Sequence, residues 1–560
     1  MQWILLIFAL VLSLIAAHEL VQPVDKKWTS FKKYKLPPGP NGPPVVGNLL
    51  QFWRSRSAGT LGKTFMELQE YGEMTTLHMG SMLYVLLNTN RVTREIIDKR
   101  AKITHERPHM PISGTLVSKG MRSVTQPTRI WGELRRMMRP LLNDTWTKKF
   151  EAWQDSESIH MLQSYLENPS EWYLHNSRYA TGVMYGVIAG ERLPKTDEEM
   201  QDYRKTTMEF LGTLLSTVVD FFPWLECLPH CLQFWRHRWQ VMGDNHHRVF
   251  KSWWNPLVAK ATNEKSHSSS NDGDNTYWVK DVLLHSNAPF KGNEDEAAYL
   301  TNTVISAGGD NPRIALNTCI MASIIHPDAF QKCLQEIESV CNSTTNPESP
   351  SSSSPCRLPT VADIPHMPYT CAFIKETLRW RPTVPMVPPH TAAEDFTFED
   401  YIFPKGTNFL LNVPALCRDY PSPDAFLPER WLSSSNHDGN ENDYDEGGNN
   451  GHNDEKEVSG DPTRLTRDFW GFGGGRRICI GYKAAQTALF LPFARLVQCF
   501  DFEKTSDFDD KKVNSWNSEA PFPVAIRIRK RKEEEEKENK IYEDLIQTAV
   551  ENLRLPSSSS

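Results

Sequence analysis

The sequence predicts a mainly helical protein with a minor β region, arranged as one large domain behind an N-terminal membrane anchor. Three observations predict this architecture. Apolar residues recur with helical spacing through most of residues 60–340, strand-like runs are confined to two short stretches, and the first 17 residues are almost entirely apolar. The chain has 560 residues, of which 39% are hydrophobic and 11% aromatic, so it can bury a large core.

The apolar start of the chain predicts an uncleaved transmembrane anchor over residues 1–22. The run from Trp3 to Ala17 is interrupted by Ser13, and as a helix it would be about 22 Å long, slightly short of a thin bilayer core. A cleaved secretory signal is the competing interpretation. It is disfavoured because basic residues follow the run, from Lys26 onward, instead of preceding it. Positive charge on that side favours a body that stays in the cytosol.

Residues 23–48 predict a basic, proline-rich hinge, because the prolines between positions 35 and 48 exclude a helix. One domain over residues 49–530 is expected to follow, with a hairpin at 75–88 and strand-and-turn structure at 395–415. Polar segments without apolar residues to bury predict disordered loops at 263–275 and 342–355, a disordered insert at 433–461, and a charged disordered tail at 531–560.

Charge and cysteine content exclude several classes of function. The net charge of -7 leaves no basic footprint for nucleic acid. Ten cysteines are spread thinly and include no C-x-x-C pair, which argues against a disulfide scaffold and against a structural zinc site. A reducing compartment fits this usage best.

One cysteine, Cys479, lies in the glycine- and arginine-rich stretch "FWGFGGGRRICIGYKAAQ". Arg476 and Arg477 precede it, and a helix that begins after Gly481 would point its positive end at the sulfur. These neighbours favour a thiolate. The chemistry alone leaves two interpretations open, because a cysteine in a glycine-rich loop is often inert.

The spacing F-x-x-G-x-R-x-C-x-G around this cysteine resembles the heme-binding signature of the cytochrome P-450 family, the heme-thiolate monooxygenases, and the chain looks similar to microsomal fungal members. The matching residues are Phe472, Gly475, Arg477, Cys479 and Gly481. The resemblance implies the cytochrome P-450 fold and a heme b whose iron is axially ligated by Cys479. The other four residues are then expected to bind the cofactor.

Two further motifs of the family occur upstream in the expected order. Glu376 and Arg379 in "KETLRW" match its E-x-x-R pair, and Arg430 in "FLPERW" matches the residue that completes a structural triad with them. Trp131 and Arg135, four residues apart, match its W-x-x-x-R pattern, and His390 follows the E-x-x-R helix. The resemblance implies that these last three residues bind the heme, whose propionates need cationic or hydrogen-bonding partners.

The stretch "VISAGGDNPRIAL" at 304–316 resembles the family's oxygen-activating motif A-G-x-[DE]-T, with Asn311 in place of threonine. Two glycines inside a helix, Gly308 and Gly309, cost about 1 kcal/mol each, so we expect a local opening for O2 and water. We predict that Asp310 and Asn311 are the catalytic residues and deliver protons there through ordered water.

The resemblance implies a monooxygenase that inserts one oxygen atom from O2 into an apolar small molecule, with electrons from NADPH through a flavoprotein reductase. The substrate is expected to be a secondary metabolite of polyketide, terpenoid or indole type. The protein is expected to be single-pass in the endoplasmic reticulum membrane, with its catalytic domain cytosolic and no nucleic-acid partner. Two alternatives stay open, a heme-thiolate isomerase or ring-forming oxidase, and a heme protein that binds a ligand without turnover.

Overall fold

The computed structural model describes residues 34–142, 144–267, 277–284, 288–342, 357–384, 386–432, 469–513, 520–530 and 540–553. The predicted anchor at 1–22 and the predicted insert at 433–461 lie outside these residues. Among the helices that the structure does describe, none has the length and apolar character needed to cross a membrane.

The chain divides into two compact units by its internal contacts, and one catalytic domain over residues 49–530 stays a prediction. The first comprises Met1–Pro108 with Pro389–Asn412, and the second comprises His109–Pro388 with Val413–Ser560. Helices dominate and the strands form small sheets, so the predicted mainly helical fold class is confirmed.

The first unit is built on a four-stranded sheet in the order β1-β2-β6-β3, with strands at Met74–Met79, Met82–Leu87, Asn408–Leu411 and His390–Thr391. β1 and β2 form the antiparallel hairpin that the sequence predicts at 75–88, and β2 pairs in parallel with β6. A second hairpin joins β4 (Phe396–Phe398) to β5 (Tyr401–Phe403), as predicted for 395–415. Among its described residues, from 34 onward, this unit has helices α3 (Leu49–Ser57), α4 (Leu61–Glu67) and α5 (Asn90–Thr93) and the short turns η1 (Leu68–Tyr71) and η2 (Arg94–Asp98).

The second unit is a helical body. Its longer helices are α6 (Thr128–Met138), α7 (Asp144–Glu167), α8 (Trp172–Ala189), α9 (Asp197–Thr213), α11 (Arg236–His267), α12 (Glu294–Ile325), α13 (Pro327–Cys341), α14 (Pro368–Trp380), α16 (Tyr482–Cys499) and α17 (Ile541–Glu551). The shorter helices are η3 (Pro111–Val117), η4 (Ser123–Thr125), η5 (Arg139–Leu142), η6 (Pro169–Glu171), α10 (Val218–Phe221), η7 (Pro223–Cys227), η8 (His230–Leu232), η9 (Val279–Leu284), η10 (Val361–His366), α15 (Val413–Leu416), η11 (Pro428–Trp431), η12 (Trp470–Phe472), η13 (Gly475–Arg477) and η14 (Asp510–Lys512). Strands β7 (Phe500–Lys504) and β8 (Val524–Ile528) form a hairpin in this unit.

Helix α12 organises the second unit, where it packs against α8, α11, α14 and α16. Most of its residues are buried, so it is apolar around much of its circumference, as expected of a central helix. A capping box starts it, because the side chain of Asn293 accepts from the Glu296 N-H at 2.9 Å and the Glu296 carboxylate accepts from the Asn293 N-H at 2.8 Å. The helix ends at Ile325, and Pro327 opens α13.

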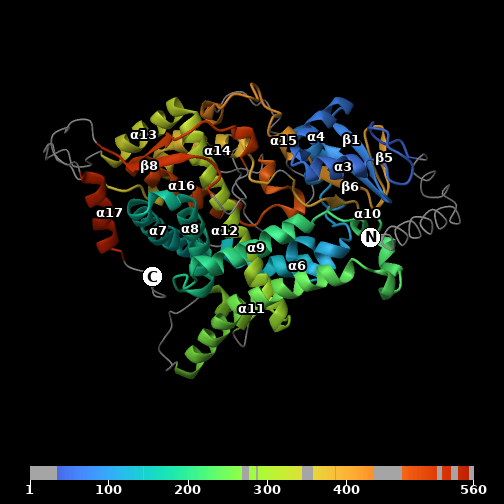
Figure 1. Ribbon diagram of the computed structural model, residues 1–560, viewed down its shortest axis with the longest axis horizontal. Helices are drawn as coiled ribbons and strands as arrows, with labels where there is room; N and C mark the ends of the chain where they lie inside the picture. Colours follow the sequence, from blue (N-terminus) through green and yellow to red (C-terminus); the bar gives the residue numbers. More distant parts are fainter. Residues whose placement is uncertain are drawn as a thin grey trace. The chain divides into compact units, whose positions relative to one another are not determined.

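The C-terminal tail differs from the prediction. Residues 541–551 form helix α17, which packs against α7 and buries Tyr542 and Ile546 (Figure 1). The apolar residues of "IYEDLIQTAV" recur with helical spacing directly after a block of charge. That block led us to expect disorder throughout 531–560, so the prediction was wrong for this segment.

Candidate functional site

The cysteine loop joins η12 to α16, and glycine geometry shapes it. Gly473 and Gly475 have φ values of 73° and 59°, in the left-handed region that side chains with a Cβ rarely adopt. The Cys479 N-H donates to the Phe472 carbonyl at 2.8 Å and closes the loop on itself. Two of the motif residues thus act through the backbone, because Phe472 supplies the acceptor and Gly475 supplies the turn.

The sulfur of Cys479 accepts a hydrogen bond from the Gly481 N-H at 3.3 Å, one residue before α16 begins. The side chain is exposed, yet the surrounding protein desolvates it enough to raise the pKa of its thiol. The Gly481 N-H and the positive charge of Arg135 act in the opposite direction, toward a lower pKa. Desolvation prevails, so the expected thiolate is not favoured by the protein alone. Coordination to a metal ion would supply the missing stabilisation.

Helix α6 is held against the cysteine loop by two arginines. Arg135 donates to the Ile478 carbonyl at 2.7 Å, and Arg477 donates to Oγ1 of Thr128, the first residue of α6, at 3.1 Å. The guanidinium carbons of Arg477 and Arg135 lie 4.3 Å and 5.1 Å from the centre of the Trp131 ring. The structure therefore brings Trp131, Arg135, Arg477 and the cysteine loop together, while their role in heme binding stays a prediction.

His390 belongs to the first unit and is placed there by strand β3. Its ring is buried, and its Nδ1 lies 2.8 Å from the Thr104 carbonyl. A carbonyl only accepts, so this contact fixes the tautomer with hydrogen on Nδ1. The other predicted heme-binding residues belong to the second unit.

Asp310 and Asn311 lie in the second half of α12 and make different contacts. Asp310 is 8% exposed and lies 3.5 Å from Nη2 of Arg313. Burial raises the pKa of the Asp310 carboxyl, although the charges of Arg313 and Arg204 oppose that shift. Arg204 is a buried residue of α9 that sequence reasoning missed, since helical spacing alone does not distinguish it from a surface arginine.

The side chain of Asn311 turns back along its own helix. Its Nδ2 donates to the Ala307 carbonyl at 3.0 Å, one turn earlier, and its Oδ1 is buried without a hydrogen-bond partner. A threonine hydroxyl would have to serve both contacts through one oxygen. Asn311 divides them between two atoms and leaves a buried acceptor available for a donor such as water.

The two glycines of the α12 motif lie where this helix packs against α8, and the local opening for O2 and water stays a prediction. The helix is continuous through Pro312. A Cβ on Gly308 would overlap Met184, and one on Gly309 would lie 3.0 Å from Oγ1 of Thr181, both on α8. A side chain at either position would require these α8 side chains to shift, so the glycines allow α8 and α12 to approach closely.

Glu376 lies at the centre of a buried ion-pair cluster. Its carboxylate accepts from Nε and Nη2 of Arg379 at 2.9 and 2.8 Å, and it lies 3.0 Å from Nε of Arg430. The Leu427 N-H and the Trp431 Nε1 also donate to it, at 2.8 and 3.0 Å. The structure thus joins α14 to η11 through the three residues that the sequence grouped as a triad.

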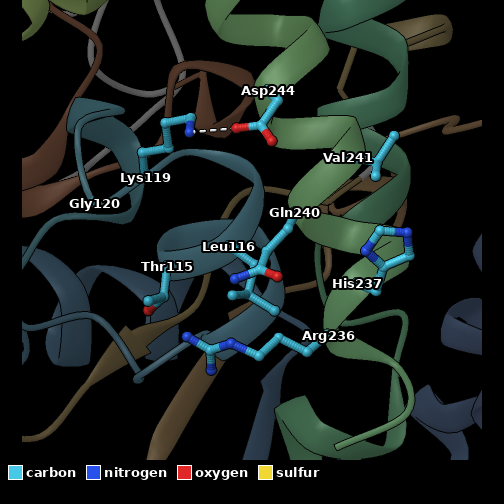
Figure 2. A pocket seen from close by; sticks show the side chains of 9 residues that line it. All are labelled: Thr115, Leu116, Lys119, Gly120, Arg236, His237, Gln240, Val241 and Asp244. Carbon is cyan, nitrogen blue, oxygen red and sulfur yellow. Dashed lines mark hydrogen bonds and ion pairs between the residues drawn. The ribbon is translucent and has the colours of Figure 1, made fainter. Parts of the chain in front are cut away.

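An open cavity of about 580 Å³ in the second unit does not include the cysteine (Figure 2). It lies between η3 with the loop after it and the start of α11, and an ion pair between Lys119 and Asp244 crosses one side of it. Its lining residues are Thr115, Leu116, Lys119, Gly120, Arg236, His237, Gln240, Val241 and Asp244. None of the residues predicted for the cofactor lines it, so the cysteine loop remains the candidate site.

The donor set of the second unit fits a heme. Cys479 offers an exposed sulfur that already accepts an N-H bond, while Arg135 and Arg477 supply the cations that propionates require. Within the described ranges, no group of three or more His, Cys, Asp and Glu side chains is placed to hold a metal ion. A metal ion that is already bound by a macrocycle such as heme needs only one protein ligand on the side of the cysteine loop, and Cys479 can be that ligand.

The family model described as Cytochrome P450 matches residues 37–524. This chain belongs to the cytochrome P450 family. It is 30% identical over 529 residues to Cytochrome P450 monooxygenase 58 of Postia placenta, which covers 91% of this chain and 89% of that protein. It is 26% identical over 493 residues to Cytochrome P450 monooxygenase yanC of Aspergillus niger, covering 86% of this chain and 84% of that protein.

A solved zebrafish cytochrome P450, determined with abiraterone, shares the fold with a TM-score of 0.61 at 19% identity, and the match covers 84% of this chain and all of that one (100%). The cytochrome P450 fold predicted from the cysteine motif is therefore confirmed. The chain is an oxidoreductase of the monooxygenase class, and its family implies a heme-thiolate cofactor.

Proposed function

We propose that this enzyme inserts one oxygen atom from O2 into an apolar small molecule, with electrons supplied by NADPH through a flavoprotein reductase. The observation that carries the proposal is the cysteine loop, in which the exposed sulfur of Cys479 accepts an N-H bond from Gly481. When bound, a heme with a thiolate ligand supplies the activation of O2. Cys479 is the proposed iron ligand.

The remaining motif residues have supporting roles in this proposal. Arg135 and Arg477 already contact Trp131 and the cysteine loop, and in the proposal their positive charge stabilises the heme propionates. His390, whose tautomer is fixed by Thr104, is proposed as a further propionate partner. Glu376 and its two arginines hold α14 and η11 in place and take no part in the chemistry.

Asp310 and Asn311 are the proposed proton-delivery residues. Because burial raises the pKa of Asp310, its carboxyl holds a proton more readily than an exposed aspartate does. The buried Oδ1 of Asn311 accepts a hydrogen bond from an ordered water, while its Nδ2 stays on the Ala307 carbonyl. In this arrangement Asp310 supplies the proton and Asn311 orients the water that carries it.

The surface around the cysteine loop supports a reductase contact. Arg136, Arg139, Arg476 and Lys483 are exposed, whereas Arg135 is half-buried and held by the Ile478 carbonyl. Four exposed cations on the side where Cys479 would bind the heme suit an acidic reductase. The apolar run at 1–22 and the lysines after it support anchoring in the endoplasmic reticulum membrane with the enzyme body in the cytosol.

Co-expression with a reductase tests the proposal. We expect NADPH-dependent O2 consumption together with a product one oxygen atom heavier than a polyketide, terpenoid or indole substrate. The reduced carbon monoxide complex should show the red-shifted Soret band of thiolate ligation, and Cys479→Ser should abolish it. Product formation without consumption of NADPH would instead identify an isomerase and refute the proposal.

A further inference from the structure

Arg122 is a buried cation between two aromatic rings in the second unit. It directly precedes η4, and 3% of its surface is exposed. Its guanidinium carbon lies 4.3 Å from the ring centre of Phe210 on α9 and 4.7 Å from that of Phe250 on α11. Cation–π contacts of this kind hold the group in one position.

The charge of Arg122 has no counter-ion among the residues that the structure describes. Its Nε and Nη2 are buried and make no hydrogen bond, and no Asp or Glu of the described segments forms an ion pair with it. Burial lowers the pKa of Arg122 to about 10, so the guanidinium remains protonated at neutral pH. An uncompensated buried cation destabilises a fold, and this fold nevertheless retains one.

The polar groups around Arg122 do not neutralise it. Tyr203 on α9 and Tyr299 on α12 are the neutral groups within electrostatic range. The carboxylate of Glu209 is engaged by His246, whose Nε2 lies 2.9 Å away, and Arg122 helps to lower the pKa of that histidine. Tyr299 Oη and His246 Nδ1 are themselves buried without hydrogen bonds. Several unused hydrogen-bonding groups therefore surround one unneutralised cation.

This cluster lies against the part of α12 that leads to the proton-delivery residues. Tyr203 donates to the Asn302 carbonyl at 2.7 Å, and it interacts electrostatically with both Arg122 and Asp310. Tyr299 precedes Ala307 by eight positions, which is about 12 Å along a helix. Ala307 is exposed at the turn where Asn311 returns to its carbonyl.

We propose that Arg122 binds the carboxylate of the substrate, and that the enzyme accordingly takes an apolar carboxylic acid. The carboxylate forms charge-assisted hydrogen bonds with the guanidinium between Phe210 and Phe250. The apolar body of the acid extends along α12 past Tyr299 toward Ala307, which lies about 12 Å further along the helix. The proposal rests on the proposed function only in taking the bound acid to be the molecule that is oxygenated. Binding of the acid stands independently of turnover.

The first experiment compares acids with their methyl esters on the wild-type, heme-loaded enzyme without reductase or NADPH. The probes are saturated fatty acids and arylalkanoic acids of graded length, each paired with its ester, and binding is measured by isothermal titration calorimetry. We expect the preferred acid to bind about 10- to 100-fold more tightly than its ester, the range expected for hydrogen bonds to a charged group. Equal binding of every pair, or no binding of any acid, would overturn the proposal.

The second experiment replaces the cation. Arg122→Gln should reduce acid affinity about 10- to 100-fold and leave ester affinity unchanged, while Arg122→Lys should retain part of the acid preference. Lys119→Gln is the matched control, because Lys119 is on the same loop but already pairs with Asp244 at 2.6 Å. It should leave the acid preference intact. Equal losses of acid affinity in Arg122→Gln and Lys119→Gln would show a nonspecific charge effect and refute carboxylate binding by Arg122.

A third variant separates binding from folding. Arg122→Met removes the uncompensated charge, so it should melt at the same temperature as wild type or higher while losing the acid preference. A merely structural arginine would instead lower the melting temperature when replaced. If acids bind selectively but no NADPH-dependent oxygenation is found, the proposed function fails, and the role of Arg122 in binding the carboxylate stands. Oxygenation without a preference for acids would refute carboxylate binding by Arg122 and leave the proposed function intact.

Discussion

Replacing Glu376 with glutamine should destabilise the second unit more than any exposed charge change. The variant keeps the shape of the side chain but removes the negative charge that Arg379 and Arg430 share. Glu376 is fully buried (0% exposed), so water cannot replace the lost anion. Arg379 would keep its bonds to the carbonyls of Cys417, Pro423 and Ala425, yet its charge would be uncompensated.

The expected size of the effect follows from this burial. Removal of one partner from a buried ion pair costs about 3–5 kcal/mol, and folded domains are stable by about 5–15 kcal/mol in total. Loss of the charge therefore removes about a fifth or more of the stability, which corresponds to a fall in melting temperature on the order of 10 °C. The Leu427 N-H and Trp431 Nε1 bonds go to acceptor oxygens of the same carboxylate, so part of that hydrogen bonding is lost too.

The assay is thermal denaturation of the heme-loaded enzyme, followed by both circular dichroism and heme absorbance. Glu429→Gln is the control. Glu429 is on η11, as Arg430 is, and it forms a surface ion pair with Lys332 of α13 at 2.6 Å. A surface pair of this kind contributes at most about 1 kcal/mol. If Glu376→Gln and Glu429→Gln melt within about 2 °C of each other, the reasoning from burial is wrong.

Three further outcomes are expected. Asn311→Leu should raise the NADPH consumed per product several-fold, measured by parallel cofactor and product assays, because it removes the buried Oδ1 acceptor; unchanged coupling would contradict the proposed water. Gly186→Ala should cost about 1–3 kcal/mol by chemical denaturation, because its Cβ would overlap the Trp153 ring, whereas Gly212→Ala has open space and should be neutral or stabilising. Burial raises the pKa of Asp220 from 3.8 to about 6, so its contribution to stability is fully present below pH 3.8 and is lost as pH rises through 6. Asp220→Asn should therefore be more stable than wild type at pH 7.5, by as much as about 3 kcal/mol in urea titrations, and a variant that is less stable there would refute the assignment.

The candidate site could be predicted largely because its residues act within short, ordered motifs. The turn between Phe472 and Cys479 has Gly475 at a positive φ, and this preference for glycine is readable from sequence. The pairing of Glu376 with Arg379 follows from their spacing on one helix face. Arg430 joins them from a distant part of the chain, so its place depended on the family resemblance instead of on local physics.

Features that depend on packing between distant segments were not predictable. Gly308 was interpreted from its own helix, and its close approach to Met184 on α8 does not follow from helical spacing. The helix at 541–551 was overlooked because the preceding charge dominates its composition, whereas the face that packs on α7 decides its structure. Arg122 carries no motif, and its significance arises only because Phe210 and Phe250 close around it.

The buried side chains around α12 carry more positive than negative charge. Three buried arginines, Arg122, Arg204 and Arg313, lie within electrostatic range of Asp310 or of Tyr203 beside it, and the carboxylates that act on them are Asp310 and, for Arg204, also Asp197. Arg204 also has buried nitrogens, Nε and Nη1, that make no hydrogen bond. A region with this excess of positive charge is stabilised by an incoming anion and destabilised by an incoming cation. A neutral apolar molecule would leave that excess uncompensated. A carboxylic acid suits the region better, because it neutralises one guanidinium while its apolar body fills the rest.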